Sequence, residues 1–164
     1  MDRIIELAEI LRNEYEGRDI FDTAENAGAI VWFRELGSLK GFYVCENGKR
    51  YIIINSTMNK LLRRTVCAHE LGHDTLHREL SAGGLRENSL FLSSNKTERE
   101  ANLFAAEILL TDDETLSVLE YSQSVDEAAF ELGVLPEILS YKLELLNHKG
   151  YSFNIQSASS DFLK

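Results

Sequence analysis

Apolar residues recur at helical spacing near the start of the chain and then form short strand-like runs. From Arg3 to Tyr15, apolar residues lie three or four positions apart with charged residues between them, which predicts an amphipathic helix. A shorter helical pattern covers 19–27 and ends at Gly28. Runs rich in β-branched and aromatic residues then predict three strands, at 29–33, 40–45 and 50–55.

The second and third predicted strands are separated by a turn signal. Asn47-Gly48 lies between them, and an Asn-Gly pair flanked by apolar runs favours a two-residue hairpin because both residues tolerate a positive φ. We therefore expect a small antiparallel sheet of about three strands directly before the next helix.

The second half of the chain shows only helical periodicity. Asn55 or Ser56 is the expected N-cap of a helix that runs to about residue 78. Another helix is expected over 97–110. Between the two, the Gly-, Ser- and Asn-rich segment 81–95 predicts a mobile loop that borders the cleft, and a lid over the cleft is the functional alternative to an ordinary loop.

The pattern beyond residue 110 predicts further short helices. Two of them begin at the capping boxes Thr111/Glu114 and Ser124/Glu127. The segments 126–133 and 136–147 have the outline of a helix-turn-helix, with Pro136 suited to the first helical position. Because the second of these helices begins without Lys or Arg, we expect the pair to pack as structure beside the cleft and not to bind DNA.

Length and composition favour a single α+β domain. The chain has 164 residues, of which 44% are hydrophobic and one is proline, and this suits one packed core. We expect a domain over 1–150, made of N-terminal helices and sheet (1–55), two central helices (56–110) and C-terminal helices (111–150), followed by a flexible tail over 151–164. Without a long apolar run, a signal-peptide pattern or a cysteine motif, the protein is expected to be soluble and cytoplasmic.

Acidic residues are concentrated in the C-terminal third of the chain. The formal net charge is −10, and the segment 112–144 contains nine Asp or Glu but one basic residue, Lys142. Such a surface repels phosphate, which argues against nucleic-acid binding. Most of these acids are expected to form an ordinary solvated face, but the same face would attract a basic protein partner.

The stretch 65–73 contains an HExxH pattern made by His69, Glu70 and His73. Histidines four apart share one face of a helix, so both rings can bind one metal ion. The Glu70 carboxylate would lie beside the metal and accept a proton from the water that the metal activates. The ordinary alternative is a helix whose two histidines bind no metal, and a third ligand is needed to exclude it.

Two parts of the chain can supply that third ligand. His77 continues the histidine series, but three ligands on one straight helix spread too widely for a tetrahedral site. The next helix offers Glu98 as a zinc ligand and, on the same face, Asn102 as an acceptor for the other ring nitrogen of a ligand histidine. Glu100 points elsewhere and is expected to form a capping box with Thr97. We therefore predict Glu98 as the third ligand.

Together, the two motifs resemble the ImmA/IrrE family of zinc metallopeptidases. His-Glu-Leu-Gly-His at 69–73 is followed by Leu-His at 76–77, and 98–110 has the pattern ExEANxFAAExLL. The resemblance extends over about 20–147. In one departure, Leu-Leu is followed by Thr-Asp where many members have a proline, which affects the end of the helix more than the chemistry.

This resemblance implies a zincin-like, gluzincin-type fold with one zinc ion. His69, His73 and Glu98 would bind the zinc, Glu70 would be the general base, and Asn102 would support a ligand histidine. The implied function is that of an endopeptidase that cleaves a helix-turn-helix transcriptional repressor and so relieves repression of a phage or another mobile genetic element.

Details of substrate binding are expected from general chemistry. An extended substrate would add itself to the sheet edge near 52–55. Tyr141 could donate a hydrogen bond to the oxyanion of the transition state, although a tyrosine that only packs in the core is the ordinary interpretation.

Two other classes of function remain open. One is a non-proteolytic regulator that keeps a zinc-stabilised fold and binds the repressor, and Glu70 argues against it because a structural site needs no acid beside an open metal position. The other is a transcription factor that binds DNA through its C-terminal helices, which their acidic charge disfavours.

Overall fold

The computed structural model describes residues 1–78 and 95–154. The predicted loop over 81–95 lies outside the described residues except for its last position, and so does most of the predicted tail over 151–164. In the described part of the chain, no helix combines the length and apolarity that a membrane crossing demands.

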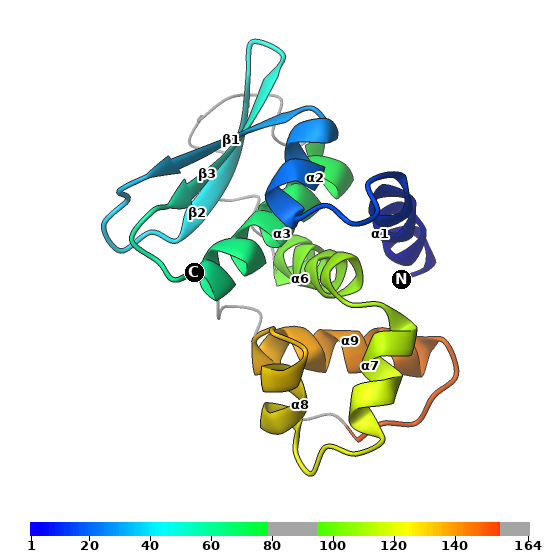
Figure 1. The fold of residues 1–164 in the computed structure, drawn as a ribbon. Helices are drawn as coiled ribbons and strands as arrows, with labels where there is room; N and C mark the ends of the chain where they lie inside the picture. The colour runs from blue at the N-terminus through cyan, green and yellow to red at the C-terminus, as the bar shows by residue number, and fades with distance from the viewer. Residues whose placement is uncertain (79–94, 155–164) are drawn as a thin grey trace.

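Helices and strands together make an α+β fold (Figure 1). The N-terminal elements are α1 (Asp2–Glu14), α2 (Ile20–Asn26), β1 (Ala29–Arg34), β2 (Gly41–Glu46) and β3 (Lys49–Asn55). They are followed by α3 (Lys60–Leu76), α6 (Asn95–Leu109), α7 (Asp112–Leu119), α8 (Val125–Glu131) and α9 (Pro136–His148). The predicted elements in the described residues are all present, with ends that differ by a few residues.

The three strands form a mixed sheet and not the predicted antiparallel one. Strand β3 lies in the middle, with β2 antiparallel on one side and β1 parallel on the other. The β2–β3 hairpin is as predicted, because Asn47 and Gly48 both have positive φ at 50° and 76°. The prediction failed for β1 because the chain crosses the end of β3 between β1 and β2, and Asn55 fastens that crossing by donating to the carbonyls of Gly37 and Leu39 at 3.0 and 2.9 Å.

This topology corrects the predicted edge for substrate. Residues 52–55 belong to β3, whose backbone pairs with a strand on each side, so they offer no free edge. Helix α3 contacts both β2 and β3, which places β2 as the outer strand next to the metal motif.

Two N-cap predictions were wrong. Asn59, and not Asn55 or Ser56, caps α3 by accepting a hydrogen bond from the Leu62 amide at 2.9 Å. Thr97 lies inside α6, which already begins at Asn95, so it is not an N-cap. The other capping predictions are confirmed, since Thr111 caps α7, Ser124 caps α8 and proline opens α9.

Helix α6 is the centre of the molecule. Figure 1 shows it between α3 on one side and α1 and α9 on the others, and every residue from 101 to 108 is buried. It approaches α3 closely where Gly72 faces Ala101, since a Cβ on Gly72 would lie 3.1 Å from both the Cα and the carbonyl oxygen of Ala101. The glycine of the HExxH segment therefore lets the two helices cross at short distance.

An ion pair joins the sheet to the C-terminal end of α3. Arg50 of β3 donates to Asp74 at 2.5 Å and to the carbonyl of Ala27 at 2.6 Å. The guanidinium occupies the space that a side chain on Gly28 would need, and Gly28 also has a positive φ of 92°. Because Asp74 directly follows His73, this contact fixes the motif helix against the sheet.

Buried charges join α6 to the C-terminal helices. Lys142, predicted as the one base on an acidic face, is instead 0% exposed and donates to Glu107 at 2.7 Å and Asp112 at 2.6 Å. Lys149 donates to the same two carboxylates. A buried ammonium group is costly unless it is paired in this way, so the network holds α7 and α9 in fixed positions on α6.

The network makes stability depend on acid pH. Burial alone raises the pKa of Asp112, but the hydrogen bonds from Lys142 and Lys149 outweigh it and the pKa lies below 3.8. A carboxyl group with a lowered pKa in the folded state stabilises the protein above its unfolded pKa, and this contribution is lost as the pH falls. We expect Asp112→Asn to lower the free energy of unfolding at pH 7 by about 1–2 kcal/mol. The deficit should shrink toward pH 3, as urea unfolding at both pH values would measure.

Asp113→Asn is the matched control, because Asp113 is exposed and its substitution removes the same charge from the adjacent position. The interpretation is wrong if both variants behave alike, or if the deficit of Asp112→Asn is independent of pH.

Candidate metal centre

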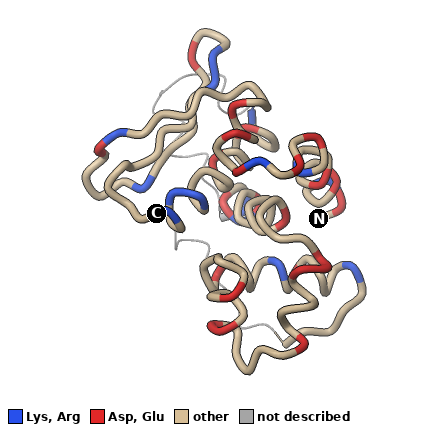
Figure 2. The backbone as a smooth tube through the Cα atoms, viewed as in Figure 1, with Lys and Arg blue, Asp and Glu red and all other residues tan. Residues whose placement is uncertain are grey.

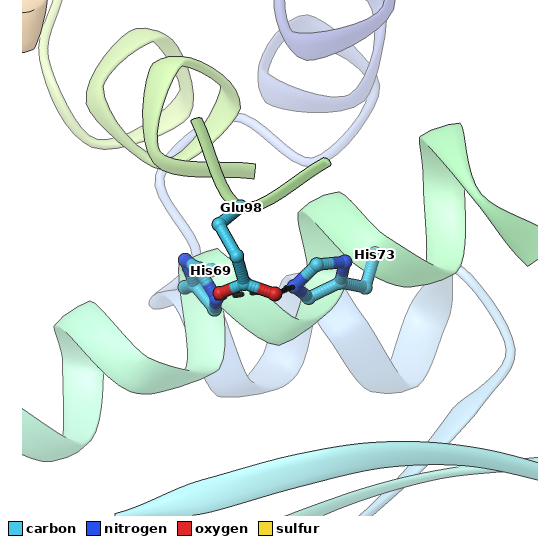
Figure 3. Close-up of side chains that lie close together, drawn as sticks. All are labelled: His69, His73 and Glu98. Atoms are coloured by element: carbon cyan, nitrogen blue, oxygen red, sulfur yellow. Dashed lines mark hydrogen bonds and ion pairs between the residues drawn. The ribbon is translucent and has the colours of Figure 1, made fainter. Parts of the chain in front are cut away.

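Three predicted ligands from two helices meet at one point. His69 and His73 lie one turn apart on α3, and Glu98 reaches them from α6 (Figure 3). The two Nε2 atoms are 3.1 Å apart, and the Glu98 carboxylate oxygens lie 3.4 Å from His69 Nε2 and 3.5 Å from His73 Nε2. The structure therefore gathers His69, His73 and Glu98 around a common centre.

The spacing of these atoms suits a small divalent cation. In a tetrahedral zinc site with bonds near 2.0–2.1 Å, neighbouring ligand atoms lie about 3.3 Å apart. The three observed distances, 3.1, 3.4 and 3.5 Å, lie within a few tenths of an ångström of that value. Two imidazole nitrogens and one carboxylate also match the ligand types of a three-ligand zinc site that leaves a fourth position open.

The environment keeps His73 in the form that a metal requires. Burial, and then the proximity of His69, lower the pKa of His73 to about 3, so its ring is neutral at pH 7. Burial also lowers the pKa of His69, but its carboxylate neighbours Glu98 and Glu70 outweigh this and the net shift is upward. A cation in the centre would replace the proton that these carboxylates attract.

Glu70 lies next to this centre in a buried position. Its exposure is 8%, and burial raises its pKa to about 7, with the Glu98 charge acting in the same direction and His69 and the backbone amide of Tyr43 opposing it. A carboxylate whose pKa is near the working pH is well suited to take up and release a proton. A cation held by its neighbours would lower this pKa again.

Asn102 supports His69 from the second helix. Its Oδ1 lies 2.7 Å from His69 Nδ1, so it can accept the proton of that nitrogen and leave Nε2 to face the centre. The amide nitrogen of Asn102 donates in turn to the Tyr141 hydroxyl at 3.4 Å. Tyr141 is buried, and its hydroxyl contacts Asn102, the residue that supports His69. The sequence did not suggest this contact.

His77 and Glu100 form a pair that the sequence interpretation missed. Glu100 Oε2 lies 2.9 Å from His77 Nε2, and His77 Nδ1 lies 3.2 Å from His73 Nδ1. Glu100 therefore contacts the motif helix and does not form the predicted capping box with Thr97. The spacing of four between His73 and His77 was the available signal, but it suggested a further ligand and not a neighbour of one.

Other residues with ligand chemistry lie elsewhere in the described chain. Cys67 is buried, its Sγ faces the Ile20 carbonyl, and burial raises the pKa of its thiol. Cys45 and Cys67 are both free. Glu107 is occupied by the lysine network, so the candidate centre depends on His69, His73 and Glu98.

The fold and the site together define the class of the protein: it is an α+β protein with a candidate His-His-Glu metal centre. Comparison with known families is more specific. The chain belongs to the family described as the IrrE N-terminal-like domain, whose model matches residues 24–144. This match includes the sheet, both helices of the candidate centre and most of the C-terminal helices, and it confirms the family resemblance noted in the sequence.

Two curated proteins from Bacillus and its phages are similar to the chain. One is the uncharacterized immunity region protein 2 of Bacillus phage phi105, 38% identical over 104 residues, which cover 63% of this chain and 65% of that protein. The other is the metallopeptidase ImmA of Bacillus subtilis strain 168, 30% identical over 144 residues, which cover 85% of each chain. The chain thus matches just under two thirds of the phage protein and most of the Bacillus one.

The geometry distinguishes a ligand from its support. Glu98→Ala removes one of the three candidate ligands, and we expect no stoichiometric zinc binding in this variant. Asn102→Ala removes only an orienting hydrogen bond, and we expect zinc affinity to fall 10- to 100-fold. Competition with a chromophoric chelator would measure both, and equal affinities in the two variants would contradict these assignments.

Proposed function

We propose that the protein is a zinc-dependent endopeptidase with a zincin-like, gluzincin-type site. The main support for the proposal is that the Glu98 carboxylate lies within 3.5 Å of the Nε2 atom of His69 and of the Nε2 atom of His73. In this proposal residues 1–150 form one metallopeptidase domain, and the helix-turn-helix-like part within 111–150 closes one side of the cleft. Membership of the family and the name of the Bacillus relative support a metallopeptidase.

The proposed reaction is hydrolysis of a peptide bond. His69, His73 and Glu98 would hold the zinc ion, which supplies an activated water and polarises the scissile carbonyl when bound. Glu70 takes the proton of the attacking water and later delivers it to the leaving nitrogen. Asn102 keeps His69 in orientation, and Tyr141 either supports Asn102 or donates to the developing oxyanion.

The outer edge of β2 is the proposed place for the substrate backbone. In the described chain no strand pairs with that edge, and the amide of Tyr43 in β2 faces Glu70. In the hairpin, Tyr43 is opposite Ile52 at a position whose backbone groups point away from β3, because pairing alternates from the Glu46–Lys49 pair at the turn. An extended peptide along β2 would thus lie beside the general base.

The proposed substrate is a helix-turn-helix transcriptional repressor of a phage or mobile genetic element in the cytoplasm. The names of the two relatives, an immunity region protein and a metallopeptidase, support this context. A repressor needs a basic surface to bind DNA, whereas α7 and α8 carry acids and no Lys or Arg (Figure 2). Cleavage would relieve repression of the element.

The main alternative is a regulator that binds the repressor without cutting it. Such a protein needs the metal for its fold but has no use for a buried carboxylate beside the centre. Direct DNA binding by α8 and α9 is disfavoured, because the first turns of both helices carry acids.

Glu70→Gln separates the two functions. Because the amide cannot take up a proton, we expect the variant to bind zinc normally and to cleave a helix-turn-helix repressor substrate 10²- to 10⁴-fold more slowly than the parent. Gel analysis of fragments and metal analysis of the same samples would measure this, with a chelator-treated parent as a second control. If repression is relieved equally well by Glu70→Gln, the protein acts as a binding regulator.

Charge should influence the encounter with an intact repressor. Exposed charges are screened beyond about 10 Å at 0.1 M salt, and steering acts mainly on the association rate. Raising the salt concentration should therefore slow cleavage of the intact repressor much more than cleavage of a short neutral peptide spanning the cut site. Replacing the exposed residues Glu114, Glu120 and Glu131 with Gln should weaken this salt dependence.

The structure excludes Glu144 from such a set, because it pairs with Arg99. Glu16, Glu25 and Glu35 are exposed in the N-terminal half, and their replacement by Gln removes the same charge as a control. The acidic surface is only a solvated face if both triple variants retain the salt dependence of the parent.

A further inference from the structure

His77 lies between a ligand histidine and a carboxylate. It caps the C-terminal end of α3, is 8% exposed, and has both ring nitrogens within hydrogen-bond distance of a partner. Its Nε2 is 2.9 Å from Glu100 Oε2 on α6, and its Nδ1 is 3.2 Å from His73 Nδ1. A series of contacts therefore extends from Glu100 on α6 through His77 to Nδ1 of His73, the ring nitrogen that faces away from the centre.

The Glu100 carboxylate, at one end of this series of hydrogen bonds, determines which ring nitrogens of His77 and His73 carry a proton. An ionised carboxylate can only accept, so Glu100 requires the proton of His77 on Nε2. A neutral His77 then has an unprotonated Nδ1, which can only accept a hydrogen bond from Nδ1–H of His73. His73 in this tautomer has no proton on Nε2, and Nε2 is the atom that lies 3.5 Å from Glu98 and 3.1 Å from His69 Nε2.

The same geometry argues against His77 as a ligand. Its Nε2 is engaged by Glu100, and its Nδ1 meets the Nδ1 of His73, which is the nitrogen on the far side of that ring from the centre. Neither nitrogen belongs to the group of ligand atoms that lie within 4.8 Å of one another.

We propose that His77 and Glu100 are positioning residues that hold His73 in the metal-binding tautomer and ring orientation. This proposal rests on the proposed metallopeptidase function and extends it. The two ligand histidines are then supported differently, His69 by the amide of Asn102 and His73 by a histidine whose own proton is set by a carboxylate. Helix α6 supplies the third ligand, the amide that supports His69 and the carboxylate that contacts His77, whereas His77 itself lies at the end of α3.

The contribution of His77 is tested by zinc affinity in the full-length protein. His77→Phe keeps a ring of similar shape but removes both nitrogens, and we expect zinc affinity to fall 10- to 100-fold. His77→Asn restores an acceptor at the position of Nδ1 and should recover affinity to within a few-fold of the parent. Competition with a chromophoric chelator measures the affinities, and the visible spectrum of the cobalt(II) forms reports the coordination geometry.

The contribution of Glu100 is tested by a double-mutant cycle. Because Glu100 acts through His77, Glu100→Ala should weaken zinc binding in the parent but have no further effect in His77→Phe. Asn102→Ala should instead add its full effect in His77→Phe, since it acts on the other histidine. Lys96→Ala is the control, because it removes the exposed second partner of Glu100 and leaves His77 in contact.

The outcomes are distinguishable. Thermal unfolding and circular dichroism of the metal-free forms identify a variant that has simply lost its fold, and His77→Asn and Glu100→Ala provide folded alternatives to His77→Phe. The inference is overturned if the parent binds zinc while His77→Phe binds it equally well with an unchanged cobalt spectrum, or if Glu100→Ala keeps its effect in His77→Phe. A parent that binds neither zinc nor cobalt would overturn the proposed function and this inference together.

Discussion

The short distance between α3 and α6 is the constraint on which the candidate site depends. Two histidines on one helix can present only two ligand atoms to a small cation, so the third must come from a helix close enough for a glutamate to reach both rings. Gly72 and Ala101 allow that approach, since even one methyl group on Gly72 would meet the Ala101 backbone at 3.1 Å. A larger residue at either position would move Glu98, Glu100 and Asn102 together, because all three lie on the same helix.

Helix α6 is held in place on its other side by charges and not only by apolar packing. Glu107 pairs with Lys142 of α9, and Arg12 of α1 donates to the carbonyls of Glu107 and Leu110. These contacts oppose rotation or sliding of α6, whereas apolar side chains such as Leu103 and Phe104 would permit small shifts at lower cost. The polar interior of the domain therefore serves to fix the register of the helix that carries Glu98.

Most features that depend on neighbouring residues were predicted correctly from the sequence, although the N-caps of α3 and α6 were not. The Asn47-Gly48 turn, the caps at Thr111 and Ser124, and the helical spacing of His69 and His73 belong to this group. Contacts between residues far apart in the sequence could not be predicted from local patterns. Strand β1 pairs with β3 in parallel, and Lys142 is buried although its neighbours in sequence are acidic. The His77–Glu100 contact depends on how two helices cross, and no periodicity within either helix encodes that.

The arrangement of functions along α6 also has a consequence for insertions and deletions. Between Glu98 and Glu107 this helix carries the candidate third ligand, the amide that supports His69, the carboxylate that contacts His77 and an anchor for two lysines. One added or deleted residue turns everything beyond it by about 100° and shifts it by about 1.5 Å along the helix axis. Such a change within this span would separate the metal site from its anchor even if every side chain remained present. Variation in length inside that ten-residue span is therefore incompatible with this architecture.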